Sequence, residues 1–432
     1  MEYRKKMLVY AHYYYPDVAS TGQILKELCE GLSSKFDITV ICAVPSYSGN
    51  VEKKYENKKY FFEDINGINV IRVSVPNFTK SNKNSRVKNL ITYFFRSIWA
   101  TYKLEKQDFI FTISQPPILG GVLGVIGKCL KKGKLIYNIQ DFNPEQTLAV
   151  GYTNNKFVLK FALAVDKFSC KMSDKVIVVG RDMQETLRNR FNNKNVPNNI
   201  FINNWIDEKE IYPLPEDNEK IKVFKKKYNL ENKIVIMYSG NIGLYYDLEN
   251  LIEVIGRFKD RDDVVFAFVG DGTKKQDIEG YANKHELENV QFIPYQHKTD
   301  LIYSLNAGDV HWVVNAKGIK GVSVPSKLYG VMAAGKTVFG VLEKGSEARL
   351  IIEDCNCGIC VEPGNYEVIY QELMNVIDNI DKYKSLGIKG KEYVDKYIKK
   401  DVAIEKYSRE ILCKKDSEQN IDSSKIIKYQ GD

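Results

Sequence analysis

The sequence predicts an α/β protein with two doubly wound domains and a cleft between them. A chain of 432 residues is too long for one ordinary core, so two domains of roughly 200 residues each are expected. Short apolar strands alternate with helical patterns, which is typical of parallel sheets covered by helices on both faces. A polar connection with two prolines, YPLPE at 212–216, separates two such series.

The first series begins with a buried strand at 7–11. A polar loop and a helix follow, and the apolar residues of that helix, from Ile24 to Leu32, share one face. The next strand, at 38–44, completes a βαβ unit. Further strands are predicted at 70–73, 109–113, 134–139 and 175–179. We assign residues 1–207 to this first domain.

The second series begins at Lys233 and defines a second domain at 208–385. Its strands are predicted at 234–238, 264–269, 290–293, 310–313, 337–340 and 358–361. A long helical pattern runs from 383 to 412, and residues 414–432 lack apolar periodicity, which predicts a flexible tail. Doubly wound sheets bind ligands at the carboxyl ends of their strands. The loops that follow the strands are therefore where functional residues are expected.

Two turns of the second domain have the composition of a diphosphate site. YSGNIG at 238–243 leaves a buried strand, and VPSKLYGVMAAG at 324–335 enters a short helix. Glycine lets the backbone approach a phosphate, and a helix start supplies free N–H groups. Lys327 adds positive charge, and Ser326 is expected as the N-cap. The alternative for Lys327 is a surface lysine at a helix start.

Two loops of the first domain are expected to line the same cleft. HYYYPDVASTG at 12–22 follows the first strand, and His12 is either catalytic or a hydrogen-bonded structural residue. QDFNPE at 140–145 follows another buried strand and carries Asp141 and Glu145. Either carboxylate is suited to accept a proton from a hydroxyl or to support a sugar, and capping of the next helix is the competing interpretation.

The positive charge lies in the first half of the chain. The net charge of +8 divides into about +13 for residues 1–200 and about −5 for the rest. Residues 72–106 carry most of the excess, interleaved with aromatic residues, and a helix at 88–103 would suit an anionic membrane surface. A core-facing helix is the alternative. No apolar run approaches the roughly 20 residues that span a bilayer, so peripheral attachment is expected.

Two features could suggest a metal site, a cluster of cysteines and a literal Asp-x-Asp motif, but neither is predicted to bind a metal. The eight cysteines form no regular framework, which fits a reducing cytoplasm, and the cluster Cys355, Cys357 and Cys360 lacks a fourth ligand. Asp260 and Asp262 close a charged helix directly before a strand, which favours a solvated turn. We therefore predict no metal and no cofactor.

The ordered set of these segments, with NNWID at 203–207, resembles the GT-B-fold glycosyltransferases of family 4. The likeness is strongest to a WbuB-like subgroup of N-acetylfucosamine transferases in bacterial surface polysaccharide synthesis. The resemblance implies two doubly wound, Rossmann-like domains, with a helix at about 386–412 packing back on the first. It also implies transfer, with retention, of an N-acetylated deoxysugar from a UDP-sugar to a lipid-linked acceptor of capsule, O-antigen or exopolysaccharide synthesis. The enzyme would work on the inner face of the cell membrane.

With this resemblance, roles are assigned to numbered positions. Catalytic roles fall to Asp141, Glu145 and Lys327, and acceptor contacts to His12, Ser20 and Gly22. The expected donor-binding residues are Gly240, Asn241, Gly243, Pro294, Ser326, Lys327 and Glu347. Many relatives carry two glutamates where this chain has Val322 and Gly330. Glu347 is therefore assigned to the ribose, and a solvated residue in the first turn of a helix is the alternative.

Two other functions remain open. A non-hydrolysing UDP-sugar 2-epimerase shares the fold and would need no acceptor. A nucleic-acid-binding protein would explain the basic aromatic stretch, although no nucleic-acid motif accompanies it and nucleic acid is not an expected partner.

Overall fold

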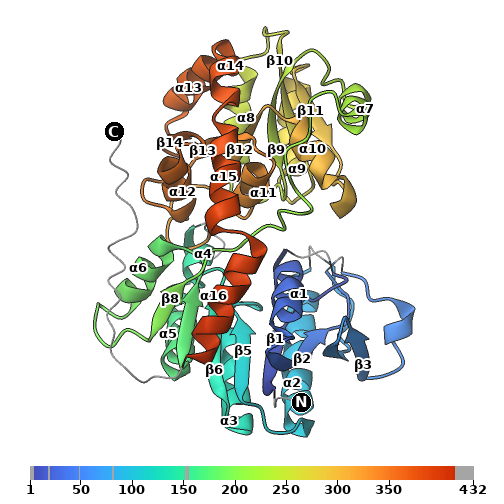
Figure 1. The fold of residues 1–432 in the computed structure, drawn as a ribbon, viewed down its shortest axis with the longest axis vertical. Coiled ribbons are helices and arrows are strands. Elements are labelled where there is room, and N and C mark those ends of the chain that lie inside the picture. Colours follow the sequence, from blue (N-terminus) through green and yellow to red (C-terminus); the bar gives the residue numbers. More distant parts are fainter. Residues whose placement is uncertain are drawn as a thin grey trace.

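The structure is a computed structural model that describes residues 4–17, 20–47, 49–79, 82–149, 151 and 155–413. Two α/β domains lie one above the other, and a long run of helices at the carboxy-terminal end spans both (Figure 1). The predicted class, two doubly wound sheets with helices on both faces, is confirmed.

The first domain contains an eight-stranded sheet in the order β3-β4-β2-β1-β5-β6-β7-β8. Seven strands run parallel, and β3 pairs antiparallel with β4 at the edge. The strands are β1 (Lys5–Ala11), β2 (Phe36–Ala43), β3 (Tyr60–Ile65), β4 (Ile68–Val73), β5 (Phe109–Ile113), β6 (Lys134–Ile139), β7 (Lys175–Val178) and β8 (Asn199–Phe201).

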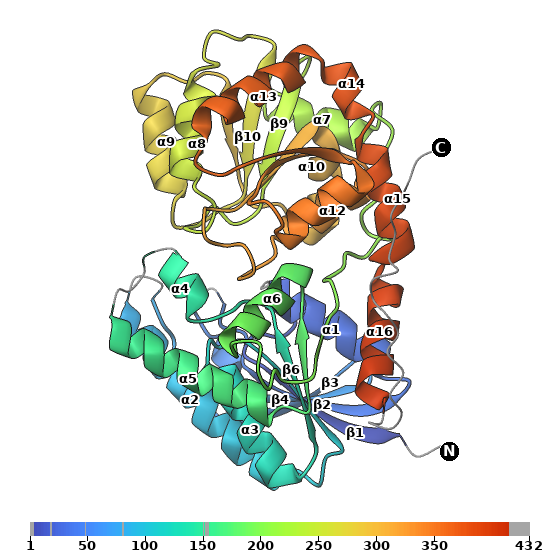
Figure 2. The same cartoon turned by 90° about the vertical axis from the view of Figure 1, so that its left-hand side faces the viewer.

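Strand β1 shows how the sequence covers both faces of this sheet. Successive side chains of a strand point to opposite faces, so Leu8 and Tyr10 pack on one side and Met7 and Val9 on the other. The helices of this domain are α1 (Ser20–Leu32), η1 (Lys53–Tyr55), α2 (Lys83–Lys103), α3 (Leu119–Lys131), α4 (Glu145–Ala149), α5 (Lys156–Met172) and α6 (Arg181–Arg190). Figure 2 shows α2, α3 and α5 side by side on the outside of the domain, with α3 packed between the other two.

The second domain contains six parallel strands in the order β11-β10-β9-β12-β13-β14. They are β9 (Ile234–Ser239), β10 (Val264–Val269), β11 (Val290–Ile293), β12 (Val310–Val314), β13 (Thr337–Val341) and β14 (Gly358–Val361). The helices are α7 (Glu219–Lys227), α8 (Leu248–Gly256), α9 (Lys275–Lys284), η2 (Lys298–Asp300), α10 (Leu301–Ala307), α11 (Lys327–Ala333), α12 (Glu347–Cys355), α13 (Tyr366–Asp378), α14 (Ile380–Lys384) and α15 (Gly387–Tyr397).

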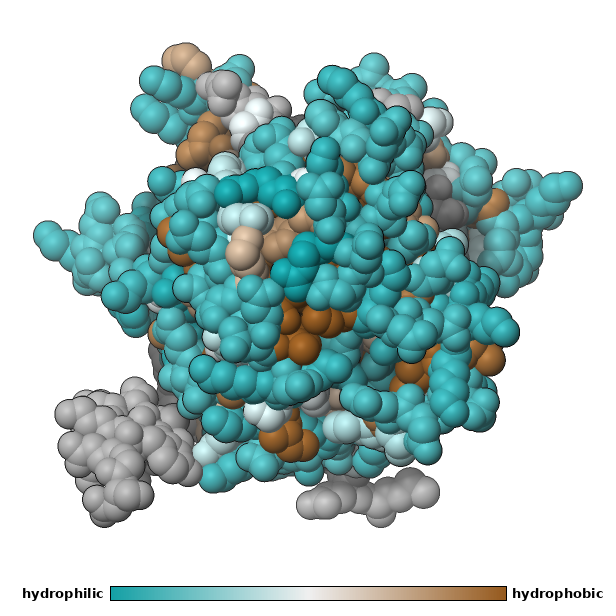
Figure 3. Space-filling view, turned by 90° about the horizontal axis from the view of Figure 1, so that it is seen from above, coloured by the Kyte–Doolittle hydropathy of each residue, from teal (hydrophilic) through white to brown (hydrophobic). Residues whose placement is uncertain are grey.

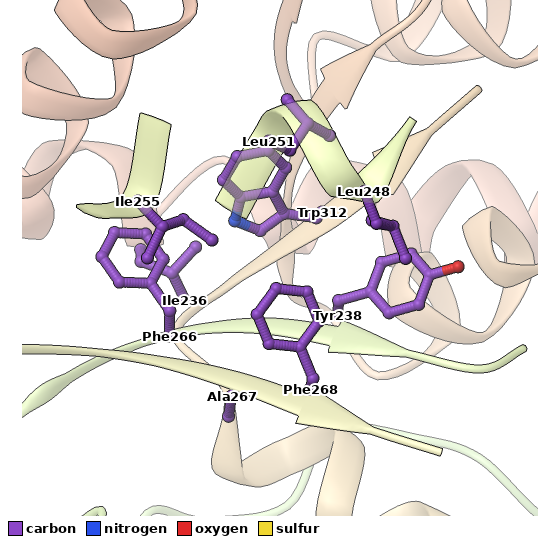
Figure 4. A pocket seen from close by; sticks show the side chains of 9 residues that line it. All are labelled: Ile236, Tyr238, Leu248, Leu251, Ile255, Phe266, Ala267, Phe268 and Trp312. Atoms are coloured by element: carbon purple, nitrogen blue, oxygen red, sulfur yellow. The ribbon is translucent and has the colours of Figure 1, made fainter. Parts of the chain in front are cut away.

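The core of the second domain under α8 is nearly close-packed. A gap of about 10 Å³ remains among apolar side chains of β9, β10, β12 and α8, which is at most the space of one water molecule. Figure 4 shows these side chains, and the hydroxyl of Tyr238 points away from the others. That hydroxyl donates a hydrogen bond to the carbonyl of Asn241, at 2.6 Å. The gap is therefore a packing feature, and Tyr238 connects the core to the loop after β9.

The two domains are joined by continuous packing and by a helix that returns to the first domain. One apolar cluster includes Phe142 and Met183 of the first domain together with Leu328 and Ile351 of the second. The predicted helix at 383–412 is divided into α14, α15 and α16 (Lys400–Leu412). Helix α16 packs against α1, and the Tyr407 hydroxyl accepts a buried hydrogen bond from the Asn138 amide at 3.0 Å. Within the described residues, no helix combines the length and apolarity needed to cross a bilayer.

Candidate active site

Lys327 is a partly buried cation in an aromatic setting. Its ammonium nitrogen lies 3.5 Å from the ring centre of Tyr246 and 5.0 Å from that of Tyr238. Aromatic faces attract a cation but do not neutralise it. No described Asp or Glu pairs with Lys327, and burial lowers the pKa of its ammonium to about 7. The arrangement favours an incoming anion, which would restore the charge of this lysine.

The turn after β9 lies directly under this lysine. Gly240 has φ +142°, and a Cβ built there would lie 2.5 Å from the Cε of Lys327. Gly240 is therefore required both by its backbone conformation and by the path of the Lys327 side chain. The amide of Ile242 donates to the carbonyl of Asp271 at 2.9 Å, so this turn and the one after β10 support each other. Asn241 is exposed at the tip, and its side-chain amide covers Gly243.

The first domain contributes a cavity of about 170 Å³ between α2 and the loops after β1, β5 and β6. Asp141 and His12 both line it, so two of the residues predicted from separate loops come together here. The other lining residues that could bind a polar ligand are Arg86, Asn89, Ser114, Gln115, Asn143 and Gln146. Burial raises the pKa of Asp141, although hydrogen bonds from Ser323 and Gln146 oppose the shift.

His12 is neutral at physiological pH and is held by α2. Its Nε2 lies 3.2 Å from Oδ1 of Asn89, and the amide nitrogen of Asn89 donates to the carbonyl of Pro76 at 2.8 Å. The Asn89 oxygen must therefore accept, so His12 carries its proton on Nε2 and has a free lone pair on Nδ1. Burial lowers the pKa of His12 to about 4. His12 is thus suited to orienting a hydroxyl rather than to binding a phosphate by charge.

The loop after β6 contacts the second domain directly. Asp141 forms an isolated antiparallel bridge with Ser323, and the amide of Phe142 donates to the carbonyl of Val322 at 2.9 Å. The Lys327 ammonium lies over the ring of Tyr246. The pKa of the Tyr246 hydroxyl is raised, mainly by burial and secondly by the negative charge of Asp141. Tyr246 therefore contacts the lysine of its own domain and is close enough to the Asp141 carboxylate of the other domain to be influenced by its charge.

Glu145 is not part of this cavity. Its two oxygens accept from Nε of Arg190, at 2.6 Å, and from the neighbouring guanidinium nitrogen. The same arginine also pairs with the buried Asp166. Because both Glu145 oxygens are engaged in a structural ion-pair network, the structure gives no support to the expected catalytic role of Glu145.

Glu347 has a different environment from the one that its ribose-binding assignment needs. It is 1% exposed and accepts from the amide and Nε of Arg181, at 2.8 and 2.9 Å, and from the Asn203 amide at 2.8 Å. Arg181 and Asn203 belong to the first domain, so Glu347 joins the two domains. The solvated position considered as the alternative is contradicted, because the carboxylate is buried.

Replacing Glu347 with Ala is expected to lower the free energy of unfolding by about 2 kcal/mol, because it leaves the Asn203 amide and the Arg181 backbone amide without their acceptor. Asp354→Ala is the matched control, since this exposed carboxylate contacts the same arginine and should cost well under about 1 kcal/mol. Urea unfolding measures both variants. Unchanged stability in Glu347→Ala combined with weaker nucleotide binding would restore the ribose assignment.

The remaining predicted positions are spread over both domains. Pro294 is exposed after β11, at the carboxyl edge of the sheet. Ser326 occupies the N-cap position of α11 as expected, but its side chain makes no capping hydrogen bond. Gly22 is buried against the loop after β1, where a Cβ would meet the Tyr13 carbonyl at 3.1 Å. Ser20 begins α1, and its side chain lies outside the described residues.

Tyr246, Arg86, Asn89 and Ser323 were not selected from the sequence. Tyr246 and Ser323 flank the two turns, but their residue types carry no particular phosphate chemistry. Arg86 and Asn89 were visible only as members of a basic helix, because their position beside His12 depends on how α2 packs. Asp260 and Asp262 are exposed in a turn after α8. Among the described residues, no three His, Cys, Asp or Glu side chains come close enough to hold a metal ion.

Residues 219–393, within the second domain, match the family described as glycosyl transferases group 1. Two relatives match over most of the chain. The probable glycosyltransferase WbjE of Pseudomonas aeruginosa is 26% identical over 77% of this chain and 82% of its own length. The putative colanic acid biosynthesis glycosyl transferase WcaI of Escherichia coli K12 is 26% identical over 94% of this chain and 99% of its own.

Solved structures match the whole fold. Sucrose-phosphate synthase from Thermosynechococcus elongatus superposes with a TM-score of 0.72 at 15% identity, covering 94% of this chain and 98% of that one. HepE from Anabaena, solved with UDP and glucose, gives 0.67 at 14% identity and covers 94% and 99%. The lipopolysaccharide glycosyltransferase WaaG gives 0.64 at 13% identity with the same coverage.

The fold and the matches define a glycosyltransferase with the GT-B fold. More particularly, residues 219–393 are similar to group 1 glycosyltransferases, and the chain is similar over most of its length to WbjE and WcaI. The finer assignment to a WbuB-like subgroup stays a prediction.

Proposed function

We propose that this enzyme transfers a sugar, with retention, from a UDP-sugar to a lipid-linked acceptor during synthesis of a bacterial surface polysaccharide. The names of WbjE and WcaI support the transferase activity, the colanic acid synthesis named for WcaI supports the pathway, and the UDP in HepE supports the nucleotide. An N-acetylated deoxyhexosamine is the donor sugar that the sequence resemblance suggests. The observation that carries the proposal is Lys327, which lies beside the Gly240 turn and pairs with no Asp or Glu among the described residues.

In this proposal the second domain stabilises the leaving group. As the glycosidic bond to the diphosphate breaks, negative charge grows on the phosphate oxygens, and a positioned cation lowers the energy of that state. The Lys327 ammonium would pair with these oxygens, and backbone amides between Gly240 and Gly243 would donate to them. Ser326 and Pro294 would contact the rest of the nucleotide. The low pKa of Lys327 means that diphosphate binding takes up a proton at pH values above about 7.

The first domain would hold the acceptor in the cavity lined by His12 and Asp141. Asp141 would accept the proton of the attacking hydroxyl, and His12 Nδ1 would accept a hydrogen bond from another hydroxyl of the acceptor and so orient it. Arg86, which also lines the cavity, is suited to an anionic group on the acceptor, such as a phosphate of a lipid carrier. Gly22 would act indirectly, by letting the loop after β1 that carries His12 pack closely against α1.

Membrane attachment through α2 is part of the proposal. The residues expected to contact the membrane now exclude the start of the basic stretch 72–106. Arg72, at the start of the basic stretch 72–106, is fully buried and pairs with Glu63 at 2.7 Å, so it does not contribute. The exposed face of α2 carries Phe95, Trp99 and Tyr102, which are 64%, 54% and 61% exposed. This face combines aromatic rings with lysines and arginines, as membrane-surface helices do. The enzyme would then act on the inner face of the cell membrane.

The proposed function is tested by mixing the protein with UDP-, GDP- and TDP-sugars, first alone and then with a membrane extract that contains lipid-linked acceptors. We expect UDP-sugars to raise the melting temperature, because a ligand that binds only the native state stabilises it. We then expect sugar to appear in the lipid fraction only when extract is present. Release of an isomeric UDP-sugar without extract would identify an epimerase instead, and a melting temperature unaffected by every nucleotide sugar would contradict the proposal.

A further inference from the structure

We infer that α5 is a second lipid-binding helix, which lies on the headgroup region of an anionic membrane beside α2. The outward face of α5 carries Phe157, Val158, Phe161 and Phe168, with exposures of 88%, 54%, 73% and 52%. Phenylalanine rings this exposed are costly in water, and a contiguous apolar face usually marks a binding surface. The inference extends the membrane attachment proposed for α2 to residues 156–172.

The inward face of α5 is fixed by polar contacts, so the phenylalanines cannot turn inward. Asp166 is buried, accepts from the Tyr137 hydroxyl at 2.7 Å and pairs with Arg190. Ser169 and Cys170 are buried next to it on the same side. Rotating the helix to bury Phe161 would expose these residues and break a buried ion pair, which is strongly destabilising. The exposed stripe is therefore a property of the folded protein.

The charge of this surface points to an anionic occupant. Helices α2, α3 and α5 contain eleven lysines and arginines and a single acidic residue, Asp166, which is the buried one. On α5 the exposed lysines Lys156, Lys160 and Lys171 border the phenylalanine stripe. Long lysine stems can follow an apolar surface while their ammonium groups reach headgroup phosphates.

The arrangement of the helices makes one surface of the two stripes. Helix α3 packs between α2 and α5, and all three lie on the outside of the first domain (Figure 2). The exposed stripe of α2 runs through Val87, Ile91, Phe95 and Trp99, which are four residues apart and therefore share one face of the helix. By contrast, the far end of the second domain is mostly hydrophilic (Figure 3). A broad surface of aromatic rings and lysines, whose three helices carry no exposed carboxylate, fits a lipid headgroup layer better than a protein partner.

The test measures binding of the full chain to vesicles of phosphatidylglycerol and phosphatidylcholine by co-sedimentation. Three proteins are compared: wild type, the double variant Phe157→Ser with Phe161→Ser, and the control Phe62→Ser. Phe62 is 77% exposed on the edge strand β3, so the control removes an equally exposed ring elsewhere in the same domain. We expect the α5 variant to bind at least tenfold more weakly to anionic vesicles and the control to bind as wild type. High salt should weaken the binding of the wild type to anionic vesicles.

Two further measurements distinguish the α5 inference from the proposed function and from the proposed membrane attachment through α2. The UDP-induced rise in melting temperature should be the same in all three proteins, so its absence would count against the proposed function and not against α5. A parallel variant of α2, Phe95→Ser with Trp99→Ser, tests the attachment already proposed. The inference would be overturned if the α5 variant bound vesicles as tightly as the wild type. It would also be overturned if the wild type did not bind vesicles and instead formed concentration-dependent dimers that the α5 substitutions abolish.

Discussion

Replacing Lys327 with Met is expected to lower kcat/KM for the nucleotide sugar by about 100- to 1,000-fold, the usual effect of removing one group that stabilises a developing anion. Methionine keeps much of the side-chain bulk over Gly240 and against Tyr246, so the loss is assigned to the charge. Steady-state kinetics with a fixed acceptor measures the effect. Activity within threefold of wild type would remove Lys327 from the mechanism.

The low pKa of Lys327 predicts how kcat/KM and stability depend on pH, and Lys327→Met tests both predictions. The lysine must be protonated to hold a diphosphate, so kcat/KM of the wild type should fall as pH rises above about 7, and the variant should lack this alkaline limb.

The second prediction concerns the pH dependence of stability, because the lysine of the unfolded chain keeps its ordinary pKa of roughly 10.4. The unfolded state then binds more protons between about pH 7 and 10, so wild-type stability rises with pH in this window. Lys327→Met should therefore be at least as stable as wild type at pH 6, with an advantage that shrinks towards pH 10.

Replacing Asp141 with Asn is expected to reduce kcat by about 100- to 10,000-fold, the range attributed to a positioned general base. Asparagine has the same shape and can still accept from Gln146, so the fold and the rise in melting temperature with UDP should persist. The control is Glu145→Gln, because Glu145 belongs to the same segment but pairs with Arg190. That variant should lose stability and keep its activity per folded molecule.

The acid limb of the pH profile offers a second measurement on Asp141. Burial raises the pKa of this carboxyl, so activity should fall with acid at a higher pH than an ordinary aspartate would give. The limb should be absent in Asp141→Asn. If Asp141→Asn and Glu145→Gln reduce kcat by the same factor, the assignment of the base to Asp141 is wrong.

The fold was largely predictable because its strands are continuous apolar runs, as in strand β10, which is buried along its whole length. Strands β3 and β8 were missed because neither is an apolar run. Strand β3 alternates exposed and half-buried residues on the edge of the sheet, and β8 has only three residues. The long terminal helix pattern did not reveal the breaks that separate α14, α15 and α16; the break between α15 and α16 lies where the chain passes from the second domain to the first.

The site was predictable where chemistry and local sequence coincide. Gly240 and Lys327 were found because a glycine turn after a buried strand and a lysine at a helix start each indicate phosphate binding. The environments of Glu145 and Glu347 depend on arginines 45 and 166 residues away in the chain, and no local pattern reveals such partners. For the same reason Arg86 and Tyr246 joined the site only when the packing of α2 and of the β9 loop was known.

The central claim is that Lys327 and the turn at Gly240 hold the diphosphate of the donor in the cleft between the domains. A crystal structure of the protein with UDP tests it most directly. We predict that the β-phosphate lies within ion-pair distance of Lys327 Nζ and accepts hydrogen bonds from backbone amides between Gly240 and Gly243. A nucleotide bound elsewhere, or one whose phosphates leave Lys327 against the Tyr246 ring without contacting it, would contradict the account.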